Sequence, residues 1–317
     1  MLAFYRRLYP FKSIFSWLNH EHTPTKLFTH REFAFTLPGD VYLRYNSFNT
    51  ADELKKQVCN LNPTRFEIGP VYSARPKDKK TVRPAAFSPR LRELVFDIDM
   101  TDYDSVRTCC SEADICKRCW AFIAAAVHVL DEGIRDQYGY KHLLWVYSGR
   151  RGIHLWISDQ EAMELTDEQR KALVGWMTVI QGGKEMHKKV NGPIDAALED
   201  IVLQYTYPRL DAEVSKHRNH LLKAPFCVHP KTGRVCVPVD PATVDRFDPE
   251  RVPTVAQLLK ELDQTSIPAG EPAENEERHS DWENTSLKPY VEMLDKHALT
   301  IMNEVRRTKR GASDLSW

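Results

Sequence analysis

The sequence has no long apolar run, no secretory signal and no internal repeat. No segment approaches the roughly 18 consecutive apolar residues that a membrane-spanning helix needs, so we expect no association with a membrane. The first ten residues carry neither an apolar signal core nor a small-residue cleavage site. We therefore expect an intracellular protein in a reducing compartment.

The chain also has no net charge, because 44 basic residues balance 44 acidic ones. Over the whole chain, that balance argues against binding of nucleic acid. The distribution is uneven, however: residues 261–283 contain eight acids and one base, so the rest of the chain carries a net charge of +7. Binding of nucleic acid needs only a basic strip where the phosphates lie. Charge alone therefore leaves both such a strip and ordinary solvated charge open.

With 317 residues, 42% of them hydrophobic, the chain can form a substantial core in one large domain or two small ones. Apolar periodicity, caps and turn residues predict a mixture of helices and strands, and hence an α/β or mixed α+β fold. Helices are expected at 4–18 with a break at Pro10, and at 51–61, 120–138, 166–182, 255–262 and 287–310. Strands are expected at 33–37, 41–45, 65–71, 93–100, 143–147, 153–157, 201–207 and 234–239.

Residues 264–284 are rich in Pro and Glu and poor in large apolar side chains, which is typical of a flexible linker. We therefore divide the chain into a core at 1–263, this acidic linker, and a C-terminal helical segment at 285–317 that packs back on the core. Within the core, residues 73–92 are expected to form an exposed loop, either simply solvated or in contact with nucleic acid. Its cations are Arg75, Lys77, Lys79, Lys80, Arg83, Arg90 and Arg92.

Two carboxylates are predicted to share one face of the strand at 93–100. Side chains alternate along a strand, so Asp97 and Asp99 point the same way while Phe96, Ile98 and Met100 point into the core. Carboxylate oxygens are the ligands that Mg²⁺ and Mn²⁺ prefer, and two such ions can activate a hydroxyl and stabilise leaving pyrophosphate. Asp211, which follows the strand expected at 201–207, is a candidate third acid. A pair of surface acids, or the Asp-x-Asp of a glycosyltransferase, is the alternative.

A glycine-flanked turn at 148–152 lies between two predicted strands. It carries Arg150 and Arg151 and is followed by His154, a set suited to a triphosphate because guanidinium groups grip phosphate through paired hydrogen bonds. An exposed turn with solvated arginines is the alternative. Further basic candidates follow downstream: Lys216, His220, Lys223 and His229.

Four of the seven cysteines fall within eleven positions, at Cys109, Cys110, Cys116 and Cys119. Four thiolates in one short loop fit a tetrahedral, structural Zn²⁺ site, and a reducing compartment disfavours disulfides. Cys59, Cys227 and Cys236 are scattered, and we expect them to be buried thiols.

Several of these motifs, in this order, resemble the eukaryotic-type DNA primase small subunit of the archaeo-eukaryotic primase family. The resemblance runs from about Phe4 to Leu262 and is carried by residues 93–103, the cysteine run, the turn at 147–154 and residues 219–229. Glu32 and Arg44 match its N-terminal part. The resemblance implies a mixed α/β catalytic core with a zinc knuckle at 109–119. The family's helical subdomain is shortened or deleted near 190–200, where we expect a turn and a short link.

The resemblance also implies roles for individual residues. Asp97, Asp99 and Asp211 match the metal-binding acids, Arg44 matches a basic residue near the active centre, and Glu67 matches an acid near the ribose. The residues that match the triphosphate site are Ser148, Arg150, Arg151, His154, Lys223 and His229.

The activity that the resemblance implies is synthesis of short RNA primers from nucleoside triphosphates on single-stranded DNA, by two-metal nucleotidyl transfer in the nucleus. The implied partners are a large primase subunit with an iron–sulfur cluster and DNA polymerase alpha. A non-catalytic zinc protein that binds single-stranded nucleic acid is the alternative, and a metal-dependent glycosyltransferase is a more distant one.

Overall fold

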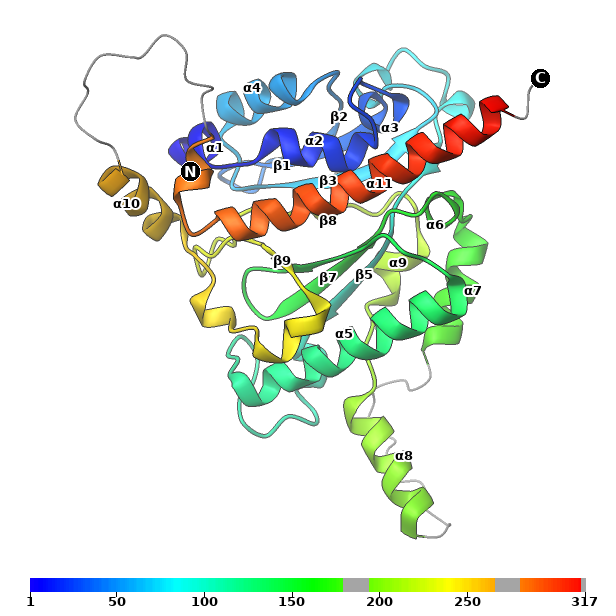
Figure 1. The fold of residues 1–317 in the computed structure, drawn as a ribbon, viewed down its shortest axis with the longest axis vertical. Coiled ribbons are helices and arrows are strands. Elements are labelled where there is room, and N and C mark those ends of the chain that lie inside the picture. Colours follow the sequence, from blue (N-terminus) through cyan, green and yellow to red (C-terminus); the bar gives the residue numbers. More distant parts are fainter. Residues whose placement is uncertain (179–193, 266–279, 315–317) are drawn as a thin grey trace. The chain divides into compact units, whose positions relative to one another are not determined.

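The computed structural model describes residues 1–178, 194–265 and 280–314. The chain divides into two compact units, each of which gathers segments that are distant in the sequence. The first unit contains residues 1–92, 221–238 and 251–317, and the second contains residues 93–220 and 239–250. Figure 1 gives the course of the chain.

The first unit is built on an antiparallel sheet. Its strands are β1 (Arg31–Thr36), β2 (Tyr42–Asn46), β3 (Arg65–Tyr72) and β4 (Pro89–Leu91), in the order β2-β1-β3-β4, and β8 (Leu222–Lys223) pairs with β3. The hairpin predicted around Pro38 is present, and Gly39 and Asp40 adopt the left-handed conformation that its turn needs. Glu67 of β3 lies opposite Lys223 of β8.

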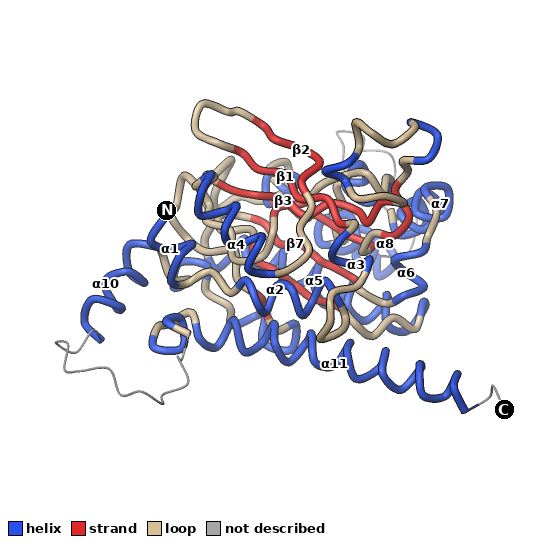
Figure 2. The backbone as a smooth tube through the Cα atoms, turned by 90° about the horizontal axis from the view of Figure 1, so that it is seen from above, coloured by secondary structure: helices blue, strands red, loops and turns tan. Residues whose placement is uncertain are grey.

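The first unit also contains helices. They are α1 (Leu2–Arg7), α2 (Phe11–Asn19), α3 (Lys26–Thr29), α4 (Ala51–Leu61), α10 (Val255–Thr265) and α11 (Lys288–Asp314). The break between α1 and α2 falls at Pro10, as predicted, and the Thr50 side chain caps α4 by accepting from the backbone of Glu53. The long helix α11 packs along α2 (Figures 1 and 2), which confirms that the C-terminal helix folds back.

The second unit contains a four-stranded sheet of β5 (Leu94–Asp99), β7 (Gly152–Ile157), β6 (Leu143–Tyr147) and β9 (Pro238–Val239), in the order β5-β7-β6-β9. Its helices are α5 (Lys117–Tyr138), α6 (Gln160–Glu164), α7 (Asp167–Met177), α8 (Ile194–Thr206) and α9 (Ala212–Lys216). The indole N–H of Trp145 in β6 donates to Asp131 of α5 at 2.9 Å, which fixes this helix against the sheet. None of the helices in the described part of the chain could cross a membrane.

Several sequence predictions are wrong. Residues 201–207 are not a strand, because Ile194–Thr206 form helix α8, so residues 194–200 are also not the expected turn. A short apolar run such as 201–207 cannot be assigned to a strand or a helix by periodicity alone. In helix α8, four large side chains of this run are exposed: Ile201, Val202, Leu203 and Tyr205. Helix α7 ends at Met177, capped by Thr178, rather than at the predicted Gly182-Gly183, which lies outside the described residues.

Three smaller predictions also need correction. Of the strand expected at 234–239, only Pro238–Val239 is a strand, and Arg234 and Val235 form single bridges. Cys59 is half-buried, whereas Cys227 and Cys236 are buried as expected. Arg92 does not belong to the exposed loop: it is fully buried and donates to the carbonyl of Ile68.

Candidate active site and cysteine cluster

The two acids of β5 lie on a strand whose register brings basic and glycine residues beside them. Asp97 pairs with His154 and Asp99 with Gly152 across the β5–β7 ladder. Directly opposed residues in an antiparallel pair project from the same face. His154 Nε2 accordingly lies 3.6 Å from Asp97 Oδ1, with the imidazole buried and the carboxylate 30% exposed. Phe96, Ile98 and Met100 are fully buried, so the predicted alternation is present.

Gly152 allows β5 and β7 to approach closely beside Asp99. A Cβ atom at this position would lie 2.5 Å from the carbonyl oxygen of Ile98, a distance that real Cβ atoms do not show. The close contact is with backbone, which cannot rotate away. The absence of a side chain at Gly152 therefore sets the spacing between the acid strand and the arginine turn.

Asp211 is brought to the outer edge of β5. Its backbone N–H donates to the carbonyl of Asp97 at 3.1 Å, and the hydroxyl of Ser215 donates to the carbonyl of Val95 at 2.6 Å. The segment that begins helix α9 thus covers the free edge of an edge strand. The Asp211 carboxylate caps α9 by accepting from the backbone of Glu213 at 3.0 Å. The third candidate acid is therefore next to the first one, although no strand precedes it.

Asp99 is already paired with a cation. Arg151 Nε lies 2.7 Å from its Oδ1 and 3.1 Å from its Oδ2, and both the backbone N–H and the hydroxyl of Thr101 donate to Oδ1. Burial raises the pKa of Asp99, but the hydrogen bonds from Thr101 and Arg151 outweigh it and leave the pKa below its ordinary value. Asp99 is therefore an ionised carboxylate held in one orientation.

Asp102 is an acid of this site that sequence reasoning missed. Burial raises its pKa, and the negative charges of Asp99 and Asp211 raise it further. A guanidinium N–H of Arg209 donates to the backbone carbonyl of Asp102 and, at 3.1 Å, to the hydroxyl of Ser105. The sequence did offer a signal for this acid, because Asp102 follows Asp99 by three residues, just after the strand ends. Together these acids form a region of negative potential at the end of β5.

The turn between β6 and β7 presents the two arginines. Gly149 adopts a φ of +89°, which only glycine tolerates easily. The Ser148 hydroxyl accepts from the backbone N–H of Gly152 at 3.0 Å, and the Tyr147 hydroxyl donates to the carbonyl of Arg150 at 2.7 Å. These bonds hold the backbone of the turn, while the Arg150 guanidinium makes no hydrogen bond or ion pair with any residue in the described ranges.

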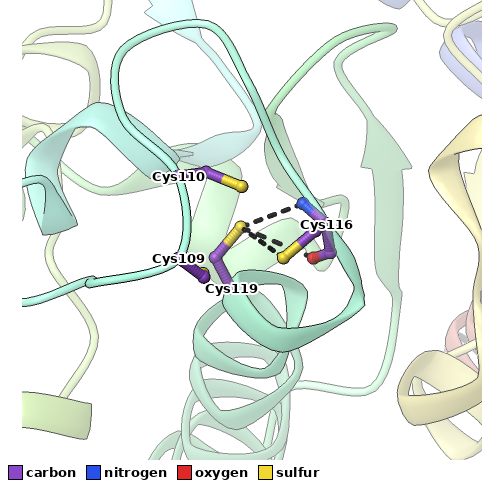
Figure 3. Close-up of side chains that lie close together, drawn as sticks. All are labelled: Cys109, Cys110, Cys116 and Cys119. Atoms are coloured by element: carbon purple, nitrogen blue, oxygen red, sulfur yellow. Dashed lines mark hydrogen bonds between the residues drawn. The ribbon is translucent and has the colours of Figure 1, made fainter.

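The four clustered cysteines converge, as Figure 3 shows. Their sulfur atoms all lie within 4.8 Å of one another, and Cys116 and Cys119 stand at the start of helix α5. Backbone amides of Cys119 and Arg118 donate to the Cys116 sulfur and lower its pKa to about 6, so this thiol is largely ionised at neutral pH. A thiolate among three further thiols is a donor set that fits zinc.

The cysteine loop is linked to the arginine turn. The buried Arg107 guanidinium donates to the carbonyls of Asp114, at 2.7 Å, and Glu112, at 3.0 Å, and so braces the loop from within. Arg151, which pairs with Asp99, also donates to the carbonyl of Glu112 at 3.4 Å. If the cysteine loop became disordered, Arg151 would lose its contact with Glu112, and the position of the cation that pairs with Asp99 would change.

Four of the predicted nucleotide-site residues belong to the first unit. Arg44 forms a two-bond ion pair with the buried Glu32, at 2.9 and 3.1 Å. Glu67 accepts from the hydroxyl of Tyr42 and pairs across the strands with Lys223. His229 begins a tight turn in which its backbone N–H donates to the carbonyl of Arg234 at 2.9 Å.

Only the cysteines gather as a metal-binding group among the described residues. No other set of three or more His, Cys, Asp or Glu side chains there converges in this way. Asp97, Asp99 and Asp211 are neighbours along the backbone edge, yet their carboxylates do not close into one ligand set. One of them is held by Arg151 and another caps a helix.

Comparison with known proteins places these features in a family. A family model described as DNA primase small subunit matches residues 96–241, which contain the acids, the cysteines and the arginine turn. The DNA primase small subunit of Schizosaccharomyces pombe is 44% identical over 354 residues, covering 84% of this chain and 78% of that protein. The chain belongs to the DNA primase small subunit family. The Drosophila melanogaster member is 32% identical, covering 98% of this chain and 92% of its own.

The alignment with this Drosophila family member spans 407 residues, more than the 317 of this chain, so that relative contains segments with no counterpart here. The archaeal family member PriS of Pyrobaculum islandicum is 24% identical and covers 73% of this chain. A solved structure titled as the polymerase domain of Mycobacterium tuberculosis Ligase D in complex with DNA matches with a TM-score of 0.48 and 12% identity, too distant to support an inference.

Proposed function

We propose that this primase small subunit synthesises short RNA primers on single-stranded DNA by nucleotidyl transfer from nucleoside triphosphates. The observation that carries the proposal is the bond between Asp211 and Asp97, which brings a third acid to the strand that bears Asp97 and Asp99. The arginine turn then supplies cations beside these acids. Acids for metal ions next to cations for phosphates are what phosphoryl transfer requires.

Asp97, Asp99 and Asp211 are the residues that would hold two divalent cations, Mg²⁺ or Mn²⁺. The donor set fits, since hard carboxylate oxygens are what these ions prefer, and the oxygens of Asp97 remain partly exposed. When bound, such ions lower the pKa of an attacking 3′-hydroxyl and brace the triphosphate for in-line displacement of pyrophosphate. The charges of Asp99 and Asp211 raise the pKa of Asp102, after the larger effect of burial, which is consistent with a negative field that attracts such ions.

Arg151 has a double role in this proposal. In the free protein its guanidinium neutralises Asp99 and thereby stabilises a negative site. When a nucleotide binds, the guanidinium exchanges the carboxylate for phosphate oxygens and leaves Asp99 free to act as a ligand. Ser148, Arg150 and His154 would hold the same triphosphate. The roles proposed for Lys223, His229, Arg44 and Glu67 rest on the family resemblance alone.

The four cysteines would hold one structural Zn²⁺. All four ligand positions are supplied by protein, so no position is left for a reacting water. The proposed role is to order the loop that contacts Arg151 through Glu112. On the resemblance, we also propose a large primase subunit with an iron–sulfur cluster and DNA polymerase alpha as partners, and the nucleus as the site of action.

The test is incorporation of labelled ribonucleotide on a single-stranded DNA template with Mn²⁺ or Mg²⁺. Template-dependent products are expected from the wild-type chain and not from an Asp97→Ala variant. Binding of single-stranded DNA without incorporation, and with no dependence on Mg²⁺, would instead identify a non-catalytic binding protein. Preferential binding of nucleotide sugars would identify a glycosyltransferase.

A further inference from the structure

The first unit carries a segment with an unusual surplus of exposed cations, which follows β3 and includes β4. We name residues 73–91 the basic loop. Its only acid is Asp78, and its exposed cations are Arg75, Lys77, Lys79, Lys80, Arg83 and Arg90.

The basic loop is folded, although like charges repel within it. The Ser73 backbone N–H donates to the carbonyl of Ser88 at 2.9 Å, and the Ser73 hydroxyl donates to the carbonyl of Ala86 at 2.6 Å. The Phe87 ring stacks on Tyr72 of β3 with centroids 4.3 Å apart and planes 9° apart. The backbone N–H of Lys77 donates to the Ser47 hydroxyl. These contacts fix the positions from which the cations project.

Most of these cations have no acidic partner. Among the residues that the structure describes, Arg75, Lys77, Lys80 and Arg83 form no salt bridge, and Lys79 lies over the Tyr45 ring at 3.4 Å. Some cations elsewhere in the described residues are paired, as for Arg135 with Asp131, Lys216 with Glu213 and Lys309 with Glu21, at 2.7–3.0 Å.

The titratable groups around the basic loop are His30, Asp78 and Glu53. His30 lies close enough to Arg75 and Lys26 for their charges to lower its pKa, after the larger effect of burial, while Asp78 opposes them. Glu53 is the other nearby acid, and three hydrogen bonds from Asn49, at 2.8–3.0 Å, together with the charges of Lys77 and Arg75, lower its pKa. Two acids, Asp78 and Glu53, therefore offset only part of the charge of the six cations, and the basic loop keeps a net positive charge.

We propose that the basic loop binds the phosphodiester backbone of single-stranded nucleic acid, with cations other than those proposed to hold the nucleotide. An ordered array of unpaired cations releases counterions when phosphates replace them, which supplies binding free energy without reading sequence. The proposal rests on the proposed function, because a primase must hold a template strand. The basic loop is the segment that we propose binds this template strand.

The experiment uses the triple variant K77Q/K80Q/R83Q and measures the affinity for a fluorescent single-stranded DNA at several salt concentrations. Lys79 is left intact because it packs on Tyr45. The logarithm of the DNA affinity falls linearly with the logarithm of the salt concentration. Loss of three phosphate contacts should make this line less steep by about 2, which corresponds to about 100-fold weaker DNA binding at 0.1 M salt. Binding of nucleoside triphosphate should be unchanged.

The matched control is K56Q/K260Q/K296Q, which removes three exposed lysines of the same unit from helices α4, α10 and α11. The control should keep the wild-type slope and affinity. If both triple variants bind DNA within twofold of wild type, the basic loop is not the binding site. Loss of triphosphate binding by the loop variant would also overturn the proposal, because the cations would then serve the nucleotide.

The two proposals fail separately. Absence of nucleotide incorporation by the wild-type chain, with DNA binding that still depends on the basic loop, would remove the catalytic proposal and keep this one. Full incorporation by the wild-type chain, with DNA binding that is unaltered in the loop variant, would keep the catalytic proposal and remove this one.

Discussion

The backbone N–H of Asp211 donates to the carbonyl of Asp97 across the outer edge of β5, at 3.1 Å. These residues are more than a hundred positions apart in the sequence, and this one bond makes them neighbours. Because β5 is the edge strand of its sheet, its free carbonyl groups need donors. The segment that meets this need carries the third acid.

The first prediction concerns the acids. Asp97→Ala, Asp99→Ala and Asp211→Ala should each reduce nucleotide incorporation by about 10²- to 10³-fold, the typical cost of losing one main electrostatic contact to the transition state. Asp99→Ala and Asp211→Ala also remove helix caps and should cost about 1 kcal/mol of stability.

Asp245→Ala is the control for the acid variants, since it removes an exposed carboxylate of the same unit whose one salt-bridge partner among the described residues is His128. It should retain full incorporation. Circular dichroism must show that all four variants are folded. Near-normal activity of a folded Asp97→Ala protein would contradict the two-metal proposal.

The second prediction concerns Arg151. Arg151→Gln should weaken binding of nucleoside triphosphate about 10- to 100-fold, the cost of a charged hydrogen bond, as measured by calorimetry. Affinity for Mn²⁺ alone should not fall, because the variant removes the cation that competes for Asp99. Arg135→Gln, which breaks an equally short ion pair on α5, should change neither value. A parallel loss of Mn²⁺ affinity in Arg151→Gln would show that Arg151 merely positions Asp99.

The third prediction concerns the cysteines. The purified chain should contain one zinc ion, and removal by a chelator should increase amide hydrogen exchange in residues 104–119 while the β1–β3 sheet keeps its protection. Zinc affinity should rise with pH, because the pKa of Cys110 is raised to about 12 and binding must displace its proton. Unchanged exchange in this loop after complete removal of zinc would contradict a structural site.

The fourth prediction concerns pH. Burial raises the pKa of Asp167, but hydrogen bonds from Arg218 and His217 outweigh it and leave the pKa below its ordinary value. A carboxyl group with a lowered pKa stabilises the fold above its unfolded pKa, near 4, and this stabilisation is lost as pH falls through the lower folded value. Asp167→Asn should therefore unfold at lower urea than wild type at pH 6, with a difference that shrinks toward pH 3. A difference independent of pH would show that the ion pair is not the cause.

The fifth prediction concerns strand spacing. Gly152→Ala should destabilise the protein by about 1–3 kcal/mol, because the added Cβ meets the backbone of Ile98 at 2.5 Å, and should also reduce incorporation by displacing Asp99. Gly175→Ala is the matched control. It lies in helix α7 with open space around it and should stabilise by about 0.5–1 kcal/mol. If Gly152→Ala and Gly175→Ala unfold at the same temperature, the close approach of β5 and β7 at Gly152 is excluded.

The sequence by itself determined the features that depend on neighbouring residues. The caps of α4 and α7, the break at Pro10, the hairpin around Gly39 and the shared face of Asp97 and Asp99 follow from local backbone preferences and from the two-residue period of a strand. The spacing of the four cysteines is local in the same sense, since their sulfurs meet across eleven positions.

Only the tertiary structure decided the contacts between distant segments. It made Ile201 part of a helix where its apolar run suggested a strand, and it buried Arg92 where its charge suggested exposure. It also paired Arg151 with Asp99 and brought Asp211 to Asp97. The physical reason is that an edge carbonyl or a buried charge is satisfied by whichever group the fold brings near, and sequence separation carries no information about that choice.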